Sequence, residues 1–277
     1  MTYFINISYM KNEQRNINDY KEKDDKILLA QILDKIEITE NRNKIQYTDF
    51  LDMAQYELVE KFIYKIKIRN YISYGGFEQA ERKMIIIYPE KFNIDVVKKN
   101  LPDIIQIIRI VLPEDLKGKY THRDYLGAVV KLGVKREKVG DIIVDRDGAD
   151  IIVQKEISKF LLENLGGLTR FSKSKIILEN IENLREVEIR REELDIIVSS
   201  NRLDNVIAEL ARCSRNKALE IINTERIFIN FQNETKKTKQ VKVGDLITIR
   251  GKGRFYIKGE VGQTRSGRTI LKIEKYI

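Results

Sequence analysis

The stretch RLDNVIAELARCSRNKALEII, residues 202–222, predicts two short helices separated by a brief break. Apolar residues from Leu203 to Leu210 recur at positions i, i+3, i+4 and i+7, which places them on one face of a helix. Ser214 follows the break and is a good N-cap for a second helix, which has its own apolar stripe. The stretch therefore predicts a helix pair near the start of the C-terminal region.

The start of the second helix is basic. Arg215 and Lys217 occupy first-turn positions, where acidic residues would suit the helix dipole better. A helix start also exposes unpaired backbone N–H groups, which makes it a ready anion site. We therefore predict that a phosphate supplies the missing negative charge, and a solvated helix end is the alternative.

Short strands and glycine turns follow this helix pair. Residues 226–230 and 246–250 alternate as strands, GKGRF (251–255) can let the backbone approach a ligand, and 262–273 reads as a hairpin. Lys236, Lys237 and Lys239 are expected to form a solvated loop that adds only diffuse charge. The residues predicted to bind RNA here are Arg202, Arg212, Ser214, Arg215, Lys217, Arg250, Lys252, Arg254, Arg265 and Arg268.

The positive charge of the chain is concentrated at its C-terminal end. The net charge is +9, and residues 199–277 carry 17 Lys and Arg against 8 Asp and Glu, while residues 1–198 are balanced. Such an excess attracts phosphates at long range, and a basic tail kept for solubility is the alternative. A polyanion is the expected partner.

Composition excludes several classes of protein. A content of 42% hydrophobic residues allows real cores, and one Cys with one His cannot form an internal disulfide or a zinc finger. The sequence has no membrane-length apolar run, and its start lacks the pattern of a secretory signal. We expect a cytoplasmic protein with no metal, no cofactor, no membrane partner and no small-molecule substrate.

The upstream pattern predicts an α+β protein with three parts. Residues 1–82 are expected to form a helical N-terminal region, with one helix starting near Thr48. Residues 83–195 alternate between strands and helices and predict a compact α+β middle domain, with a hairpin turn at 147–148. Residues 196–277 form the small C-terminal α+β domain described above.

The middle domain carries a second basic segment. Residues 115–138 hold seven Lys and Arg against three Asp and Glu. A second RNA surface is one interpretation and a solvated face is the other, since the stacked aromatic signature of common single-strand RNA modules is missing. The candidate residues are Lys119, Arg123, Lys131, Lys135 and Arg136.

Residues 199–260 resemble, as an ordered set, the small RNA-binding domain named for ribosomal protein S-four. One departure is Glu225, which stands where that pattern usually has a glycine after the second helix. Upstream, YGGFEQAERK (74–83) and THRDYLGAVVKLGVKREKVGDIIV (121–144) look like signatures of the bacterial YlmH family, whose C-terminal part is this domain. The resemblance spans nearly the whole chain.

The resemblance implies a non-enzymatic ribosome factor. A member of this family would bind the large ribosomal subunit carrying an obstructed peptidyl-tRNA, with rRNA and tRNA as partners, in ribosome-associated quality control. Two alternatives remain open: an RNA-modifying enzyme targeted as pseudouridine synthases are, and a cell-division adaptor. The acids Asp141, Asp145 and Asp147 would be available to an enzyme, but their sequence context indicates no mechanism.

Overall fold

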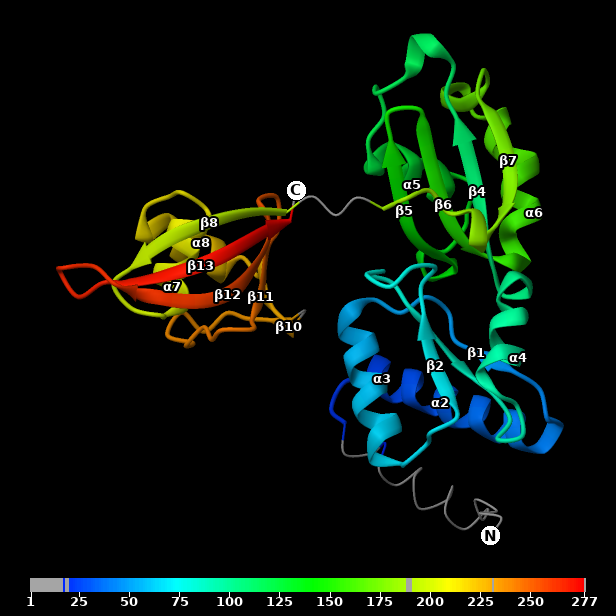
Figure 1. Ribbon diagram of the computed structural model, residues 1–277, viewed down its shortest axis with the longest axis horizontal. Helices are drawn as coiled ribbons and strands as arrows, with labels where there is room; N and C mark the ends of the chain where they lie inside the picture. Colours follow the sequence, from blue (N-terminus) through cyan, green and yellow to red (C-terminus); the bar gives the residue numbers. More distant parts are fainter. Residues whose placement is uncertain (1–16, 18–19, 188–190, 231, 277) are drawn as a thin grey trace. The chain divides into compact units, whose positions relative to one another are not determined.

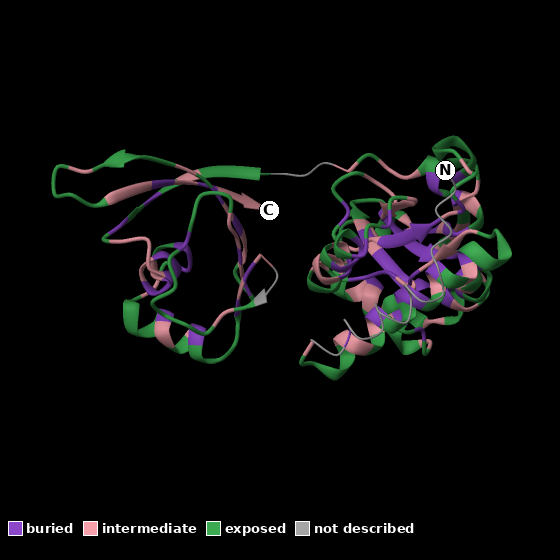
Figure 2. Cartoon of the chain, turned by 90° about the horizontal axis from the view of Figure 1, so that it is seen from below, coloured by how far each residue is buried: buried purple, intermediate pink, exposed green. Residues whose placement is uncertain are grey.

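The computed structural model describes residues 17, 20–187, 191–230 and 232–276. The chain divides into two compact units, Met1–Glu186 and Val187–Ile277, which we describe separately (Figure 1). Residues 1–16 lie outside the described residues, and so does the stretch on which the expectation about a secretory signal depends. In each unit, buried positions gather in the interior and exposed positions cover the outside (Figure 2).

The first module of unit 1 combines two helices with a small sheet. Helix α2 (Lys23–Arg42) and helix α3 (Met53–Lys65) pack on an antiparallel sheet of order β1-β3-β2. The strands are β1 (Gln46–Tyr47), β2 (Tyr71–Tyr74) and β3 (Met84–Ile87). The region expected to be helical is therefore itself α+β, and the predicted boundary at 82/83 separates β3 from the strands that it pairs with.

Helix α3 starts later than the sequence predicted. Its N-cap is Asp52, whose side chain accepts a hydrogen bond from the Gln55 N–H, while the Gln55 side chain accepts one from the Asp52 N–H. Thr48 is buried before the helix, where its hydroxyl oxygen accepts a hydrogen bond from the Ile85 N–H at 3.0 Å. The reciprocal capping box outweighs the capping ability of Thr48 because it satisfies two otherwise unpaired N–H groups.

The second module of unit 1 has a four-stranded antiparallel sheet of order β5-β6-β4-β7. Its strands are β4 (Ile105–Val111), β5 (Val139–Asp145), β6 (Gly148–Gln154) and β7 (Lys175–Asn180). The predicted hairpin is confirmed by β5 and β6. The helices are α4 (Ile94–Lys99), α5 (His122–Lys131) and α6 (Lys155–Asn164), with short 3-10 turns η1 (Leu101–Asp103), η2 (Glu114–Leu116), η3 (Arg136–Lys138), η4 (Leu165–Gly167), η5 (Thr169–Phe171) and η6 (Ile181–Asn183).

Both faces of this sheet contribute to a core. One face packs against α5 and α6, with Tyr125 and Phe171 stacked at a ring separation of 5.5 Å. The other face places Ile107 and Ile152 against Phe50 of the first module. Because this shared core joins the two modules, residues up to Glu186 form one unit.

Unit 2 is a six-stranded antiparallel sheet with two helices on one face. The sheet order is β10-β9-β11-β12-β13-β8, and the helices are α7 (Leu203–Leu210) and α8 (Arg215–Asn223). The predicted boundary at 195/196 falls inside β8, which pairs with β13 along its whole length. The strands are β8 (Arg191–Val198), β9 (Ile227–Ile229), β10 (Gln232–Asn233), β11 (Leu246–Ile249), β12 (Gly253–Gln263) and β13 (Thr269–Tyr276).

The secondary structure as a whole confirms the predicted mixed α+β class, with three antiparallel sheets among the described residues. Within the described ranges, no helix combines the length and apolar character required to cross a bilayer.

Candidate RNA-binding surface

A buried carboxylate holds two of the predicted arginines together at the start of α7. Arg202 donates to Asp204 from Nε and Nη2 at 3.1 and 3.0 Å, and Arg215 donates from Nη2 at 2.7 Å. The Asp204 side chain is 2% exposed, whereas that of Arg215 is 55% exposed. We call this group of three residues the arginine clamp. It presents two oriented guanidinium groups to solvent with one carboxylate beneath them.

The clamp places a negative charge beside the basic start of α8. Burial alone would raise the pKa of Asp204, but the hydrogen bonds from Arg202 and Arg215 outweigh it and hold the pKa below its usual range. Within the protein, the negative charge beside Arg215 therefore comes from the first turn of α7, and binding of a phosphate here stays a prediction. Because two guanidinium groups share one carboxylate, the clamp keeps an excess of one positive charge.

The start of α8 matches the prediction for its cap. The Ser214 hydroxyl accepts a hydrogen bond from the Lys217 N–H at 3.2 Å. The Lys217 ammonium pairs with Glu220 at 2.6 Å, one turn further along the helix. Arg212 is exposed in the break between the helices, in the left-handed region at φ +49°. Arg212 and Lys217 are both exposed and lie close in sequence to Arg215 of the clamp.

The loop that carries Lys236, Lys237 and Lys239, which we call the lysine loop, packs on the start of α7. The carbonyl of Lys239 accepts a hydrogen bond from the Leu203 N–H at 2.8 Å, and that of Lys237 accepts one from the Asp204 N–H at 3.2 Å. These contacts occupy N–H groups that could otherwise have bound an anion. They also hold this loop next to the clamp, while Lys236, Lys237 and Lys239 are exposed, as expected for a solvated loop.

The remaining predicted cations of unit 2 lie elsewhere. Arg250 lies over the Phe228 ring at 4.7 Å, and Arg254 lies over the Tyr276 ring at 5.0 Å. Phe228 alternates with the buried Ile227 and Ile229, which pack with the helices, so it points to the opposite side of the sheet. The arginines predicted to bind RNA in unit 2 therefore lie on both sides of the sheet: the clamp on the helix side, and Arg250 and Arg254 on the opposite side.

The turn between β11 and β12 uses its glycines as the sequence indicated. Gly251 and Gly253 have φ angles of +83° and +123°, which favour glycine. Lys252 is exposed between them. Sequence reasoning missed Arg226, whose Nη2 donates to the Arg250 carbonyl at 2.7 Å and fixes this turn. In the sequence, Arg226 is recognisable only as the residue that precedes the apolar strand, which does not indicate its contact with the turn.

Arg265 and Arg268 lie at an exposed hairpin tip, as expected. The Thr264 N–H donates to the Arg268 carbonyl at 2.8 Å and closes the turn between β12 and β13. Neither arginine is brought to the clamp by a recorded contact within the part of the chain that the structure describes.

The basic segment of the middle domain contains one residue with a structural role. The Arg136 guanidinium donates to the backbone carbonyls of Val139 and Gly140. Burial, and then the nearby charge of Arg82, lower its pKa to about 10. These contacts bind Arg136 to the protein, so its assignment to an RNA surface is revised.

The other four candidates of this segment are exposed. Lys119, Arg123, Lys131 and Lys135 all lie at the surface. Lys131 also lines a groove of about 380 Å³ between α5 and the turns η4 and η5, together with Gly127 and Arg170. The middle domain therefore keeps a basic surface along α5.

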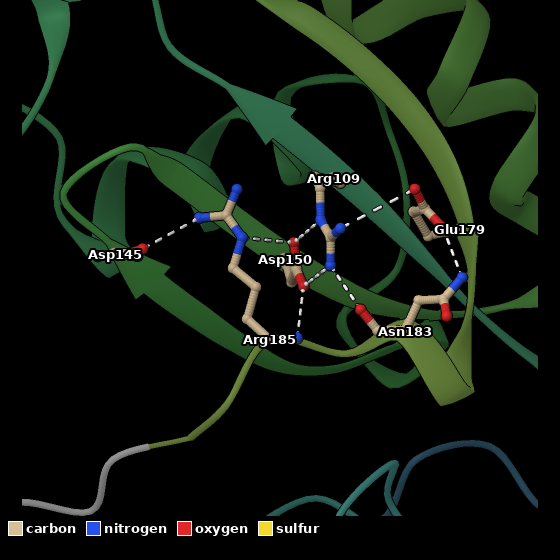
Figure 3. A network of polar contacts seen from close by, with 6 residues as sticks. All are labelled: Arg109, Asp145, Asp150, Glu179, Asn183 and Arg185. Atoms are coloured by element: carbon tan, nitrogen blue, oxygen red, sulfur yellow. Dashed lines mark hydrogen bonds and ion pairs between the residues drawn. The ribbon is translucent and has the colours of Figure 1, made fainter.

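A second carboxylate bound by two arginines lies in the middle domain (Figure 3). Asp150 is fully buried and accepts hydrogen bonds from Nε and Nη2 of Arg109, both at 2.8 Å. Arg185 adds an ion pair from Nε at 3.2 Å and a hydrogen bond from its backbone N–H at 3.1 Å. This network fastens the segment after β7 to the sheet, and no local pattern in the sequence indicates it.

The three acids considered for catalysis have separate partners. Asp141 accepts hydrogen bonds from the backbone N–H groups of Glu81 and Arg82, and Asp147 pairs with Lys117 at 3.1 Å. Asp145 pairs with Arg185 at 3.6 Å. No metal-binding group of three or more His, Cys, Asp or Glu side chains occurs among the residues with described positions.

Comparison with known proteins gives two domain matches and one long alignment. Residues 24–92 match the domain "YlmH, N-terminal", and residues 104–186 match the domain described as "Putative RNA-binding domain in YlmH". The Ribosome-associated protein quality control protein P2 of Bacillus subtilis is 27% identical over 264 residues, covering 94% of this chain and 98% of that protein.

A solved structure, the Cell division protein ylmH from Streptococcus pneumoniae, covers 60% of this chain and 97% of its own, with 20% identity and a TM-score of 0.46. The two matched domains lie in consecutive order and together cover more than half of the chain. With the alignment over nearly the full length, they support the assignment of this chain to the YlmH family.

Proposed function

We propose that this protein is a non-enzymatic, cytoplasmic RNA-binding factor that acts on the ribosome. The domain match over residues 104–186 and the name of the Bacillus subtilis relative support RNA binding and association with ribosomes. The finer proposal is that the chain binds rRNA and tRNA on the large subunit during quality control of stalled nascent chains. Unit 2 would act as an S-four-type RNA-binding domain.

The arginine clamp is the observation that carries this proposal. Arg202 and Arg215 are oriented by a buried carboxylate and remain partly exposed. Guanidinium groups held in a fixed orientation lose less side-chain entropy when they bind phosphate in a bidentate manner. The lysine loop and Lys217 add positive charge around them. Structured RNA offers the closely spaced phosphates that such a cluster fits.

The direct test is the affinity of the full chain for tRNA and for fragments of large-subunit rRNA. Arg215→Gln should weaken binding by roughly tenfold or more, since hydrogen bonds to charged groups contribute about 1.5–3 kcal/mol. A matched control, Arg42→Gln, removes an exposed arginine at the end of α2 and should leave the affinity unchanged.

A second variant separates loss of RNA contacts from unfolding caused by disruption of the clamp. Arg212→Gln combined with Lys217→Gln and Lys237→Gln removes three exposed cations whose side chains do not bind Asp204. It should weaken RNA binding without changing thermal unfolding. Unchanged RNA affinity in both variants would show that the clamp is not the binding surface.

The enzymatic alternative has its own experiment. After incubation of the protein with rRNA and tRNA, mass spectrometry would map any new nucleotide modification. We expect none. A modification that depends on the protein would overturn the proposed non-enzymatic role.

A further inference from the structure

We propose that the open face of the sheet in unit 2, the face away from α7 and α8, binds an unpaired RNA strand. This inference rests on the proposed RNA-binding function and adds a second surface to the same unit. The arginine clamp lies on the helix side, so the two surfaces would contact different parts of an RNA.

The central observation is a row of side chains that crosses five strands in register. Phe228 pairs with Thr248, and Thr248 pairs with Arg254. Arg254 pairs in turn with Tyr276, which pairs with Arg191. The positions next to them on the central strands, such as Ile249 and Phe255, are buried against the helices, so the row points to the open face.

Aromatic rings orient the arginines of this open face. Arg254 and Arg191 lie over the Tyr276 ring at 5.0 and 5.1 Å, from the two strands that flank it. Arg250 lies over Phe228. A guanidinium can stack on a ring and also interact with a base or a phosphate, and Arg191 already uses its Nη1 to donate to Glu274 at 3.1 Å. The Arg191 side chain is 41% exposed.

The acidic residues beside this row are neutralised by their neighbours. Glu274 pairs with Lys258 at 2.9 Å and with Arg191 at 3.1 Å, and Glu193 pairs with Lys258 and Lys272. Hydrogen bonds from Lys258 lower the pKa of both carboxyl groups. Lys258 and Lys272 share the compensation of these two acids with Arg191, which reduces the repulsion that the carboxylates would exert on a phosphate.

The dimensions and chemistry of the open face favour an unpaired strand. Five adjacent strands span about 19 Å at roughly 4.8 Å each, and single-strand sites begin at about four nucleotides. Stacking on guanidinium planes requires bases whose faces are accessible, which an RNA duplex hides between neighbouring base pairs. A row that combines arginine and aromatic side chains on one face of a sheet therefore fits splayed, unpaired bases.

The test compares two RNAs with the full chain and two sets of variants. The probes are an unstructured oligouridine of about 12 nucleotides and tRNA, both measured by fluorescence anisotropy. Arg191→Gln combined with Arg254→Gln should lower oligouridine affinity roughly tenfold or more, by loss of two charged contacts, with tRNA affinity changed far less. Arg215→Gln should do the reverse. Arg42→Gln combined with Lys26→Gln is the charge-matched control.

Crosslinking keeps the inference testable if the double variant does not fold. Oligouridine carrying 4-thiouridine should crosslink the wild-type chain within residues 191–197, 248–256 or 272–276. Crosslinks confined to the helix side, residues 202–224 and 234–240, would overturn the inference. Binding of tRNA without any binding of oligouridine would overturn it too and leave the proposed function intact, whereas binding of neither RNA would reject the proposed function itself.

Discussion

At the scale of single residues, Asp204 has the most consequential position. It is a first-turn acid of α7 by sequence, but its burial and its two arginine partners make it the anchor of the clamp. Its loss would remove charged hydrogen bonds to Arg202 and Arg215, which remain partly exposed and can be solvated. Asp204→Asn should therefore lower the free energy of unfolding by about 1.5–3 kcal/mol at neutral pH.

The same residue predicts a pH dependence. Because the folded state lowers the pKa of Asp204 from its ordinary 3.8, its stabilising effect is complete above that value and is lost as the pH falls through the lower folded pKa. The stability difference between wild type and Asp204→Asn should shrink below about pH 4, as measured by urea unfolding. Glu209→Gln, an exposed acid of α7, should show no such change. A constant difference down to pH 2 would contradict the role of the carboxylate.

Local rules predicted some residues well and could not predict others. Ser214 was recognisable as a cap because a cap depends on residues only three positions apart. Glu225, where the resemblance expects glycine, does adopt the left-handed conformation at φ +56°. The Asp204–Arg215 pair was not predictable, because the two residues meet only after α7 and α8 pack together.

At the scale of secondary-structure elements, the turn η3 shows how two neighbouring cations can differ. Arg136 donates to the carbonyls of Val139 and Gly140, while the Lys135 side chain is 77% exposed. Arg136→Gln should lower the free energy of unfolding by about 1–3 kcal/mol, because buried carbonyls would lose their donor. Lys135→Gln should leave stability unchanged and weaken RNA binding modestly if the α5 surface contacts RNA. Thermal unfolding and RNA titration of both variants would check this, and equal stabilities would refute it.

The sequence identified most elements but not their neighbours in the sheets. Alternating apolar residues predicted β5, β6 and β9, because alternation is a local property. The sheets to which β3 and β8 belong were not predicted, since strand pairing joins residues far apart in the chain. The row from Phe228 to Arg191 likewise depends on registers between five strands, which no single stretch of sequence encodes.

At the scale of the whole molecule, the excess positive charge of residues 199–277 is distributed over two surfaces. The clamp with its lysine loop lies on the helix side. Arg250 and Arg254 lie on the open face of the sheet, where Arg191 from outside this range joins them. The sequence places this excess in one segment of the chain but does not assign it to a face. Two surfaces instead allow one RNA to be held by a folded part and by an unpaired part.

This arrangement predicts how charge removal at the two surfaces combines. If about six phosphates are neutralised by the full chain, log affinity for ribosomal subunits should fall with log salt at a slope of roughly −4 to −5. Each neutralised contact that is lost should reduce the slope by about one. Losses of binding free energy from Arg215→Gln and from Arg191→Gln with Arg254→Gln should add, because Arg215 pairs with Asp204 on the helix side while Arg191 and Arg254 lie on Tyr276 of the open face.

The measurement is a double-mutant cycle of binding to isolated large subunits at several salt concentrations. The combined variant should lose the sum of the separate free energies within about 0.5 kcal/mol, with the shallowest salt dependence of the set. The control Arg42→Gln with Lys26→Gln should retain the wild-type slope, because α2 lies in unit 1, outside both surfaces. A combined variant no weaker than either parent would mean that one surface binds only when the other is occupied. A salt response close to zero in the wild type would remove the electrostatic basis for both.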